Sequence, residues 1–325
     1  MKKFLALALC LLMVIPAVFV GCAKADDAKV KFGAAVYVSA PSTTDATEDK
    51  NGSGKLDVTV AAVTVDKDGK IVACALDTAS STVNFTADGK AVAAGEFQTK
   101  YELGTGYNMV AYGGATKEWF EQADAFETVV AGKTLAEVKA LIADGGKGTD
   151  AVLSAGCTIT ITDFVAAVEK AYNAATVEVD AKATVKVNIA TEAAGTDATE
   201  DKDGSNKLTV NVFAAAVGAD GKIAAASSDC VEVSFTFDVN GVSTLDTTKA
   251  VLSKREKGMD YNMVAYGGAT LEWFEQANVF DAACVGKTTA EIAGLAADDG
   301  KGNADLQAAG CTITVTGFVK AATKH

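Results

Sequence analysis

Histidine and arginine are almost absent from this chain of 325 residues, which has one of each. The histidine is the last residue, His325, and the arginine is Arg255. A serine–histidine–aspartate triad and a multi-histidine metal site both need histidine inside the folded body, so the sequence excludes these two kinds of site. A hydrolase is disfavoured for the same reason.

Cysteine pairs and positive charge are also scarce. None of the 7 cysteines lies three positions from another, so the sequence offers no Cys-x-x-Cys ligand set for an iron–sulfur cluster or zinc. Apolar neighbours predict that most of the five cysteines after Cys22 are small buried hydrophobic residues. The net charge of −13 repels phosphate backbones, so we expect no nucleic-acid partner.

The N-terminus has the pattern of an export signal. Two lysines precede an apolar run over residues 4–20, and Gly21 and Cys22 follow it. This end resembles a bacterial lipobox, which implies removal of residues 1–21 and acylation of Cys22. Residues 22–27 would then be a tether, and the lipid would hold the protein on the outer face of the bacterial cytoplasmic membrane. The alternative is an ordinary secretory signal with an incidental cysteine.

The rest of the chain contains one unit twice. Residues 107–116 recur unchanged as 261–270, whereas residues 74–106 share almost nothing with 226–260. A period near 153 residues indicates a tandem domain duplication, because solenoid repeats are about 20–50 residues long. The predicted segments are two repeat domains and the junction between them, at residues 28–173, 183–325 and 174–182.

The sequence pattern of each copy predicts strands followed by helices. In the first copy the strand patterns are at residues 30–38, 56–60, 71–76, 82–86 and 158–161. Thr116 is the expected N-cap of a helix through Trp119 and Phe126, and Thr134 begins a capping box, which Thr288 repeats. We expect that second helix to end at Gly145. The sequence thus predicts an α+β fold made of two tandem copies, each an antiparallel sheet packed by two or three helices, the last of them capped by Thr162 in the first copy.

Glycine pairs mark a candidate phosphate site in each copy. Gly113 and Gly114 stand before the predicted helix, where free N–H groups attract anions, and Tyr112 can stack on a planar ring. The counterparts in the second copy are Gly267, Gly268 and Tyr266. The alternative is that the glycines form a tight turn and the aromatic residues pack in the core.

Two acidic patterns have structural alternatives. Glu118 and Glu121 form a carboxylate pair, but both also suit the first turn of a helix. The acidic loop at 45–52 has the EF-hand ligand pattern only in part, so a solvated hairpin connection competes with a calcium loop.

Two segments carry a family resemblance. Residues 63–72 and 155–160 resemble the two ends of FMN-binding domains found in bacterial surface lipoproteins and respiratory flavoprotein subunits. That family's motif reads Ser/Thr-Gly-Ala-Thr-x-Thr, and Gly156 and Thr158 match it, although Cys157 stands where the family has alanine. The second copy repeats these matches and this departure at Gly310, Thr312 and Cys311.

The resemblance implies a cofactor and partners. In that family a flavin transferase attaches FMN to the threonine through a phosphoester, and the flavin exchanges electrons with surface redox partners. The block at 107–126 is closer to a group of repeated Gram-positive surface lipoproteins. Two functions stay open: a flavin carrier for extracellular electron transfer, or a non-enzymatic lipoprotein that binds a small molecule, a wall polymer or a protein.

Overall fold

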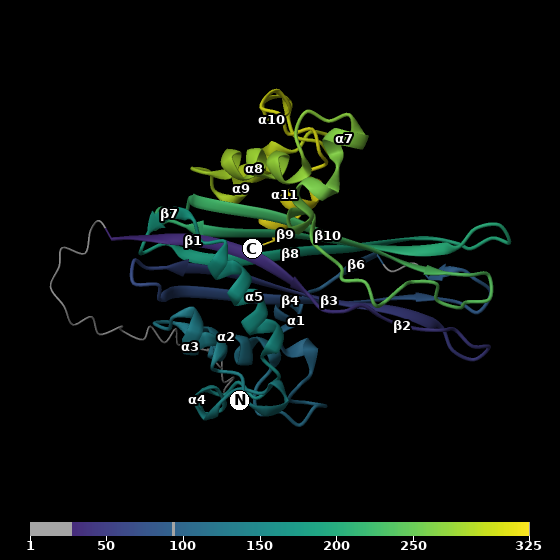
Figure 1. Ribbon diagram of the computed structural model, residues 1–325, viewed down its shortest axis with the longest axis horizontal. Helices are drawn as coiled ribbons and strands as arrows, with labels where there is room; N and C mark the ends of the chain where they lie inside the picture. The colour runs from purple at the N-terminus through teal and green to yellow at the C-terminus, as the bar shows by residue number, and fades with distance from the viewer. Residues whose placement is uncertain (1–27, 93–94, 325) are drawn as a thin grey trace, which may run out of the picture.

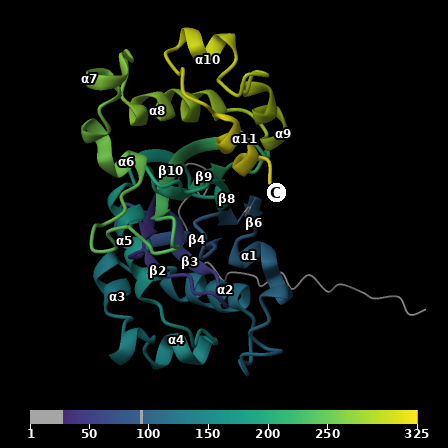
Figure 2. The ribbon, with the colours of Figure 1, turned by 90° about the vertical axis from the view of Figure 1, so that its right-hand side faces the viewer.

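The computed structural model describes residues 28–92 and 95–324. The predicted signal peptide, the tether and Cys22 lie outside these residues, so they stay predictions. Two antiparallel sheets lie face to face in the middle of the molecule, and helices cover the outer face of each. The layers therefore run helix, sheet, sheet, helix, as Figures 1 and 2 show.

In the described part of the chain, the first sheet has the strand order β5-β4-β3-β1-β7, with β2 also paired to β3. The second sheet has the order β10-β9-β8-β6. The strands are β1 (Lys29–Val38), β2 (Ser42–Thr44), β3 (Gly52–Val65), β4 (Ile71–Phe85), β5 (Ala91–Val92), β6 (Gly95–Phe97), β7 (Val177–Asp180), β8 (Thr184–Thr196), β9 (Gly204–Val217) and β10 (Ile223–Phe237).

The helices form one group on each side of the paired sheets (Figure 2). The first group is α1 (Lys100–Leu103), α2 (Trp119–Val130), α3 (Leu135–Lys139), α4 (Asp150–Ala155) and α5 (Thr162–Asn173). The second is α6 (Lys254–Lys257), α7 (Met263–Gly267), α8 (Trp273–Cys284), α9 (Thr289–Ile292), α10 (Ala304–Ala308) and α11 (Thr316–Ala322). Short 3-10 turns lie at Gly104–Tyr107, Asp144–Gly146, Gly258–Tyr261 and Ala293–Leu295.

The central strands are buried on both faces, and the sequence shows why. Residues 58–65 of β3 are all buried. Val63 packs with Phe126 of α2 in the core under the helices, whereas Val58 packs with Val210 of β9 between the sheets. A strand that is covered on both faces has no side that meets water. Its sequence is therefore a continuous apolar run and does not alternate between apolar and polar residues.

The two halves contact each other reciprocally. The amide of Ala46 donates to the carbonyl of Gly241 at 2.8 Å, and the amide of Ala198 donates to the carbonyl of Gly89 at 2.7 Å. Both members of one bond lie 152 positions from their counterparts in the other (46 + 152 = 198; 89 + 152 = 241). The copies are therefore related by a twofold-like axis, as in an isologous interface.

An aromatic pair lies between the halves. Phe85 and Phe237, again 152 positions apart, stack with their ring centroids 4.5 Å apart. Glycine leaves the room that these rings need, since a Cβ on Gly52 would lie 2.2 Å from the Phe85 ring and one on Gly204 would lie 2.5 Å from the Phe237 ring. No larger residue fits at either glycine without moving the stacked pair.

Two short strands cross between the halves. β6, from the first copy, pairs with β8 of the second, and β7, from the predicted junction, pairs with β1 of the first. Each sheet is therefore completed by a segment that lies outside its own copy. The boundaries at 173 and 183 stay a prediction.

The α+β class and the antiparallel sheets packed by helices are confirmed. The capping boxes at Thr134 and Thr288 are confirmed too, and the acidic loop at 45–52 is a hairpin connection between β2 and β3.

Several local expectations were wrong. The N-cap of α2 is Glu118 and not Thr116, because the carboxylate binds the first-turn amide. Residues 158–161 form only an isolated bridge instead of a strand, α3 ends at Lys139 before Gly145, and Thr162 is the first residue of α5 rather than its cap.

Candidate functional site

The two motif threonines lie on the surface. Thr158 is exposed, and its amide and hydroxyl both donate to Oε1 of Gln122, at 2.8 and 3.1 Å. Thr312 is also exposed and makes the same two bonds to Gln276 at the same distances. Both glutamines are buried. Each hydroxyl is thus oriented by a buried glutamine, on a threonine that is itself exposed.

The residues before the threonines turn the chain inward. Gly156 and Gly310 have φ of 103° and 104°, which is the left-handed region that favours glycine. Cys157 and Cys311 follow them and are fully buried. Burial raises the pKa of each thiol to about 11, so both stay protonated at neutral pH. Of each adjacent cysteine–threonine pair, only Thr158 and Thr312 are therefore exposed to solvent.

The glycine-pair loops project from the molecule. Tyr112 and Tyr266 are each 88% exposed. The four glycines beside them, Gly113, Gly114, Gly267 and Gly268, are exposed as well. The loop and the helix are separate elements, since α2 begins at Trp119. These residues are therefore open to solvent and do not pack in the core.

A buried carboxylate shapes each loop. The carboxylate of Glu118 accepts from the amides of Met109 and Val110 at 2.9 and 3.2 Å, and it also caps the first turn of α2 together with Glu121. Glu272 makes the equivalent bonds in the second copy. We expected the amides at the start of α2 to be free to bind a phosphate. A first-turn amide of α2 instead binds the chain's own carboxylate. The structural interpretation of the Glu118–Glu121 pair is confirmed.

A small recess is lined by Ile159 and Thr160, the two residues that follow Thr158. It has a volume of about 180 Å³, and its walls include Lys100, Tyr107, Trp119 and Thr160. The ammonium of Lys100 lies 5.7 Å from the centroids of the Tyr107 and Trp119 rings, a cation–π arrangement. Ligand pockets typically have volumes of about 300–1,000 Å³, so this recess is small for one.

A larger cavity, of about 620 Å³, lies where β4 of the first half faces β8 of the second. Its walls include residues 74–77 of β4 and 185–189 of β8, together with Tyr101, Glu127 and Lys324. None of these residues was predicted as part of a site. We call this space the interdomain cavity.

Two carboxyl groups in the cavity wall have raised pKa values. Burial raises the pKa of Asp77 to about 6 and that of Glu127 to about 8. Asp77 accepts from the amides of Thr78 and Tyr101, at 2.7 and 3.2 Å. Glu127 accepts from the amide of Leu76 at 2.7 Å.

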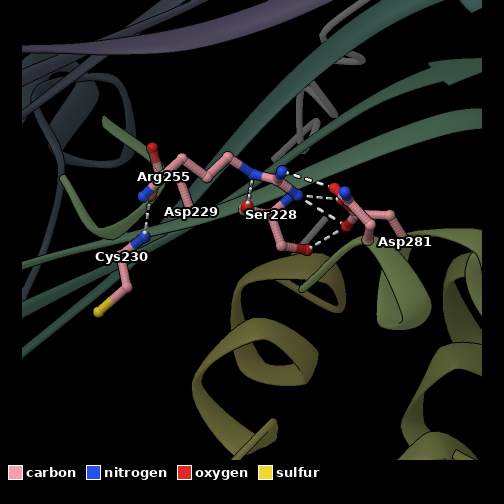
Figure 3. Close-up of polar contacts among 6 residues, drawn as sticks. Ser228, Asp229, Cys230, Arg255 and Asp281 are labelled. Atoms are coloured by element: carbon pink, nitrogen blue, oxygen red, sulfur yellow. Dashed lines mark hydrogen bonds and ion pairs between the residues drawn. The ribbon is translucent and has the colours of Figure 1, made fainter. Parts of the chain in front are cut away.

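The second half carries the same carboxyl groups together with a cation. Asp229 and Asp281 take the places of Asp77 and Glu127 (77 + 152 = 229; 127 + 154 = 281). Arg255 forms an ion pair with Asp281 and donates to the carbonyl of Ser228, as Figure 3 shows. The residue of the first half at the position of Arg255 is Tyr101 (101 + 154 = 255). The two halves thus differ in charge at one shared site.

The sequence contains one indication of this pair of buried carboxyl groups. Asp77 and Asp229 share an alternating strand context, and each follows its turn at the same distance. The flanking segments looked unrelated because most other positions differ. Within residues 28–92 and 95–324, no group of histidine, cysteine or acidic side chains could hold a metal ion.

Comparisons with protein-family models, with curated proteins and with solved structures return no match. Among the described helices, none has the length and apolar character needed to cross a bilayer.

Proposed function

We propose that this chain is a surface-anchored, non-enzymatic binding protein and that a small molecule binds in the interdomain cavity. The observation that carries the proposal is the cavity itself. Its volume of about 620 Å³ is in the range of known ligand pockets, and both copies contribute to its walls. The lipid on Cys22, which the leader pattern predicts, would hold it on the outer face of the membrane.

The wall chemistry favours binding. Val185, Val187 and Ile189 supply apolar surface, and two buried carboxyl groups with raised pKa supply polar contacts. The thiol of Cys74 also lines the cavity, but burial and the charge of Glu127 raise its pKa well above the ordinary value. A protonated thiol is a poor nucleophile, which disfavours covalent catalysis here.

A cavity-filling variant tests the proposal. Protein of residues 23–325, which includes every described residue, is screened against a diverse panel of small molecules by thermal shift. Ala75→Trp places an indole in the cavity wall, and Ser227→Trp makes the same change at the equivalent position of the second half (75 + 152 = 227). We expect Ala75→Trp to abolish the shifts that Ser227→Trp retains. A panel without binders, or binders that a folded Ala75→Trp variant retains, would refute the proposal.

Flavin attachment is the second candidate, and the exposure of both threonines supports it. An exposed hydroxyl fits the phosphoester that the family resemblance implies, and Lys147 donates to the Thr158 carbonyl at 2.8 Å, which places a positive charge nearby. The adjoining recess of about 180 Å³ does not fit an enclosed flavin ring. A flavin bound there would lie largely on the surface.

Intact mass distinguishes this second candidate. Protein produced with a flavin transferase would gain the mass of one FMN per copy and a visible flavin spectrum. The gain would disappear in the double variant Thr158→Ala plus Thr312→Ala. Unmodified mass with and without the transferase, and no uptake of added FMN, would exclude it.

A further inference from the structure

We infer that the interdomain cavity recognises a small organic cation with a planar guanidinium or amidinium head, which binds at Glu127. This inference rests on the proposed function of the cavity and names its ligand class. The second half of the same chain provides the template, because there the equivalent carboxylate already binds a guanidinium group.

The template is the contact set of Arg255. Its Nε donates to the carbonyl of Ser228, one Nη pairs with the carboxylate of Asp281, and the other donates to Oδ1 of Asn278 at 2.7 Å. Ser228 also donates to Asp281 through its amide and its hydroxyl, at 2.9 and 2.6 Å. A planar group with diverging N–H donors satisfies all three acceptors at once.

The first half has the same three acceptors. Leu76, Glu127 and Asp124 stand at the positions of Ser228, Asp281 and Asn278 (76 + 152 = 228; 127 + 154 = 281; 124 + 154 = 278). The amide of Leu76 donates to Glu127 as the amide of Ser228 donates to Asp281. The acceptors therefore have the same backbone frame in both halves.

The cation is missing from the first half. Tyr101 stands at the position of Arg255, and its hydroxyl donates to Asp124 at 3.1 Å. Among the described residues, only the amide of Leu76 donates to Glu127, and no lysine or arginine forms an ion pair with it. In an antiparallel strand the N–H and C=O of one residue point to the same side, so the Leu76 carbonyl also faces outward.

The remaining charges leave this position open to a ligand. Of the two lysines that line the cavity, Lys324 pairs with Glu102 at 2.6 Å, and Lys186 is an exposed residue on β8. The adjoining wall of β8 presents Val185 and Val187. A ligand with a cationic head and a short apolar body would match both parts of the wall.

Two matched probes test the ligand class. Butylguanidine and butylurea share one shape and differ in charge, so calorimetry with both isolates the cation. We expect one butylguanidine per chain and at least tenfold weaker binding of butylurea. The titrations are run at about pH 9, where Glu127, whose pKa is about 8, is ionised before the ligand binds. Under these conditions Glu127→Gln should weaken butylguanidine at least tenfold, because the neutral amide keeps the shape and removes the charge. Glu200→Gln, an exposed control outside the cavity, should change nothing.

Exchanging residues between the halves gives a second test. Tyr101→Arg supplies the first half with its own guanidinium and should abolish butylguanidine binding. Arg255→Ala should open the second site and raise the stoichiometry to two. If Arg255→Ala does not fold, Tyr101→Arg and Glu127→Gln still decide the question.

These experiments distinguish a failure of the proposed ligand class from a failure of the proposed function. Equal binding of the two probes would refute the ligand class, and so would butylguanidine binding that survives Glu127→Gln. If other panel compounds still bind and Ala75→Trp abolishes their binding, the cavity remains the binding site with a different ligand. Binders that Ala75→Trp does not affect would refute the proposed function as well.

Discussion

Phe85 stacks on Phe237 with the ring planes 8° apart, and both side chains are fully buried between the two sheets. The two residues are the same position of the two copies, so each ring packs against its own counterpart. The contact joins the halves at the axis that relates them.

Removing either ring should destabilise both halves. Phe85→Ala is expected to lower the free energy of unfolding by about 3–5 kcal/mol, because it removes buried area and leaves a cavity. Phe237→Ala should cost about the same. The double variant should cost less than the sum of the two, since both single variants break one shared contact. Urea denaturation measures all three, and strictly additive losses would contradict the stacking account.

Arg255 should be a stability residue in its own half. Arg255→Met keeps much of the side-chain volume but leaves the buried Asp281 without its cation, at an expected cost of about 3 kcal/mol. Adding Asp281→Asn removes the uncompensated charge and should recover most of the loss. Thermal unfolding of both variants gives the answer, and a single variant as stable as the parent would show that the ion pair contributes nothing.

The raised pKa of Glu127 predicts how the stability of the fold changes with pH. Its pKa is about 8 when folded against 4.5 ordinarily, so the folded state holds a proton that the unfolded state has lost. Stability should therefore fall as the pH rises from about 4.5 to about 8, by at most about 1.4 kcal/mol per pH unit from this group. Asp77 acts in the same sense up to about pH 6.

Glu127→Gln isolates that contribution. The titratable groups that interact with Glu127 are Asp77, Asp124, Tyr101 and the thiol of Cys74, and they remain in the variant. The decline between pH 6 and 8 should flatten in Glu127→Gln and persist in Glu200→Gln. Denaturation at a series of pH values tests this, and a parent protein that gains stability over that interval would rule out the assignment.

Glu118 should control the order of the exposed loop. Glu118→Ala leaves the amides of Met109 and Val110 without their acceptor, which should cost about 1–3 kcal/mol and speed hydrogen exchange over residues 108–114. Glu272→Ala should act in the same way on residues 262–268 of the other half. Exchange measured by mass spectrometry would show each effect in one half only; unchanged rates would mean that other contacts hold the loops.

Much of the fold could be read from local patterns. Capping boxes at Thr134 and Thr288 define helix starts because two side chains and two amides satisfy each other within four residues. The apolar run through β3 and the turn before β4 predict a hairpin for a similarly local reason. Such signals need no knowledge of distant contacts.

The site could not be read in this way. The pairing of Leu76 with Glu127 spans 51 positions, and the cavity also needs β8 from the other copy. The strand expected at 158–161 failed for a related reason: Gln122 of α2 takes the amide of Thr158, which a strand would give to a neighbouring strand. Tertiary contacts decided both outcomes.

The reciprocal bonds of Ala46 with Gly241 and of Ala198 with Gly89 are those that two identical subunits would make. In a homodimer of a single-copy chain, every substitution would appear on both sides, so the pair would carry tyrosine twice or arginine twice. Fusion into one polypeptide removes that constraint. Tyr101 and Arg255 can therefore coexist at equivalent positions of one chain, so that only one of the two copies carries an internal guanidinium beside its carboxylate.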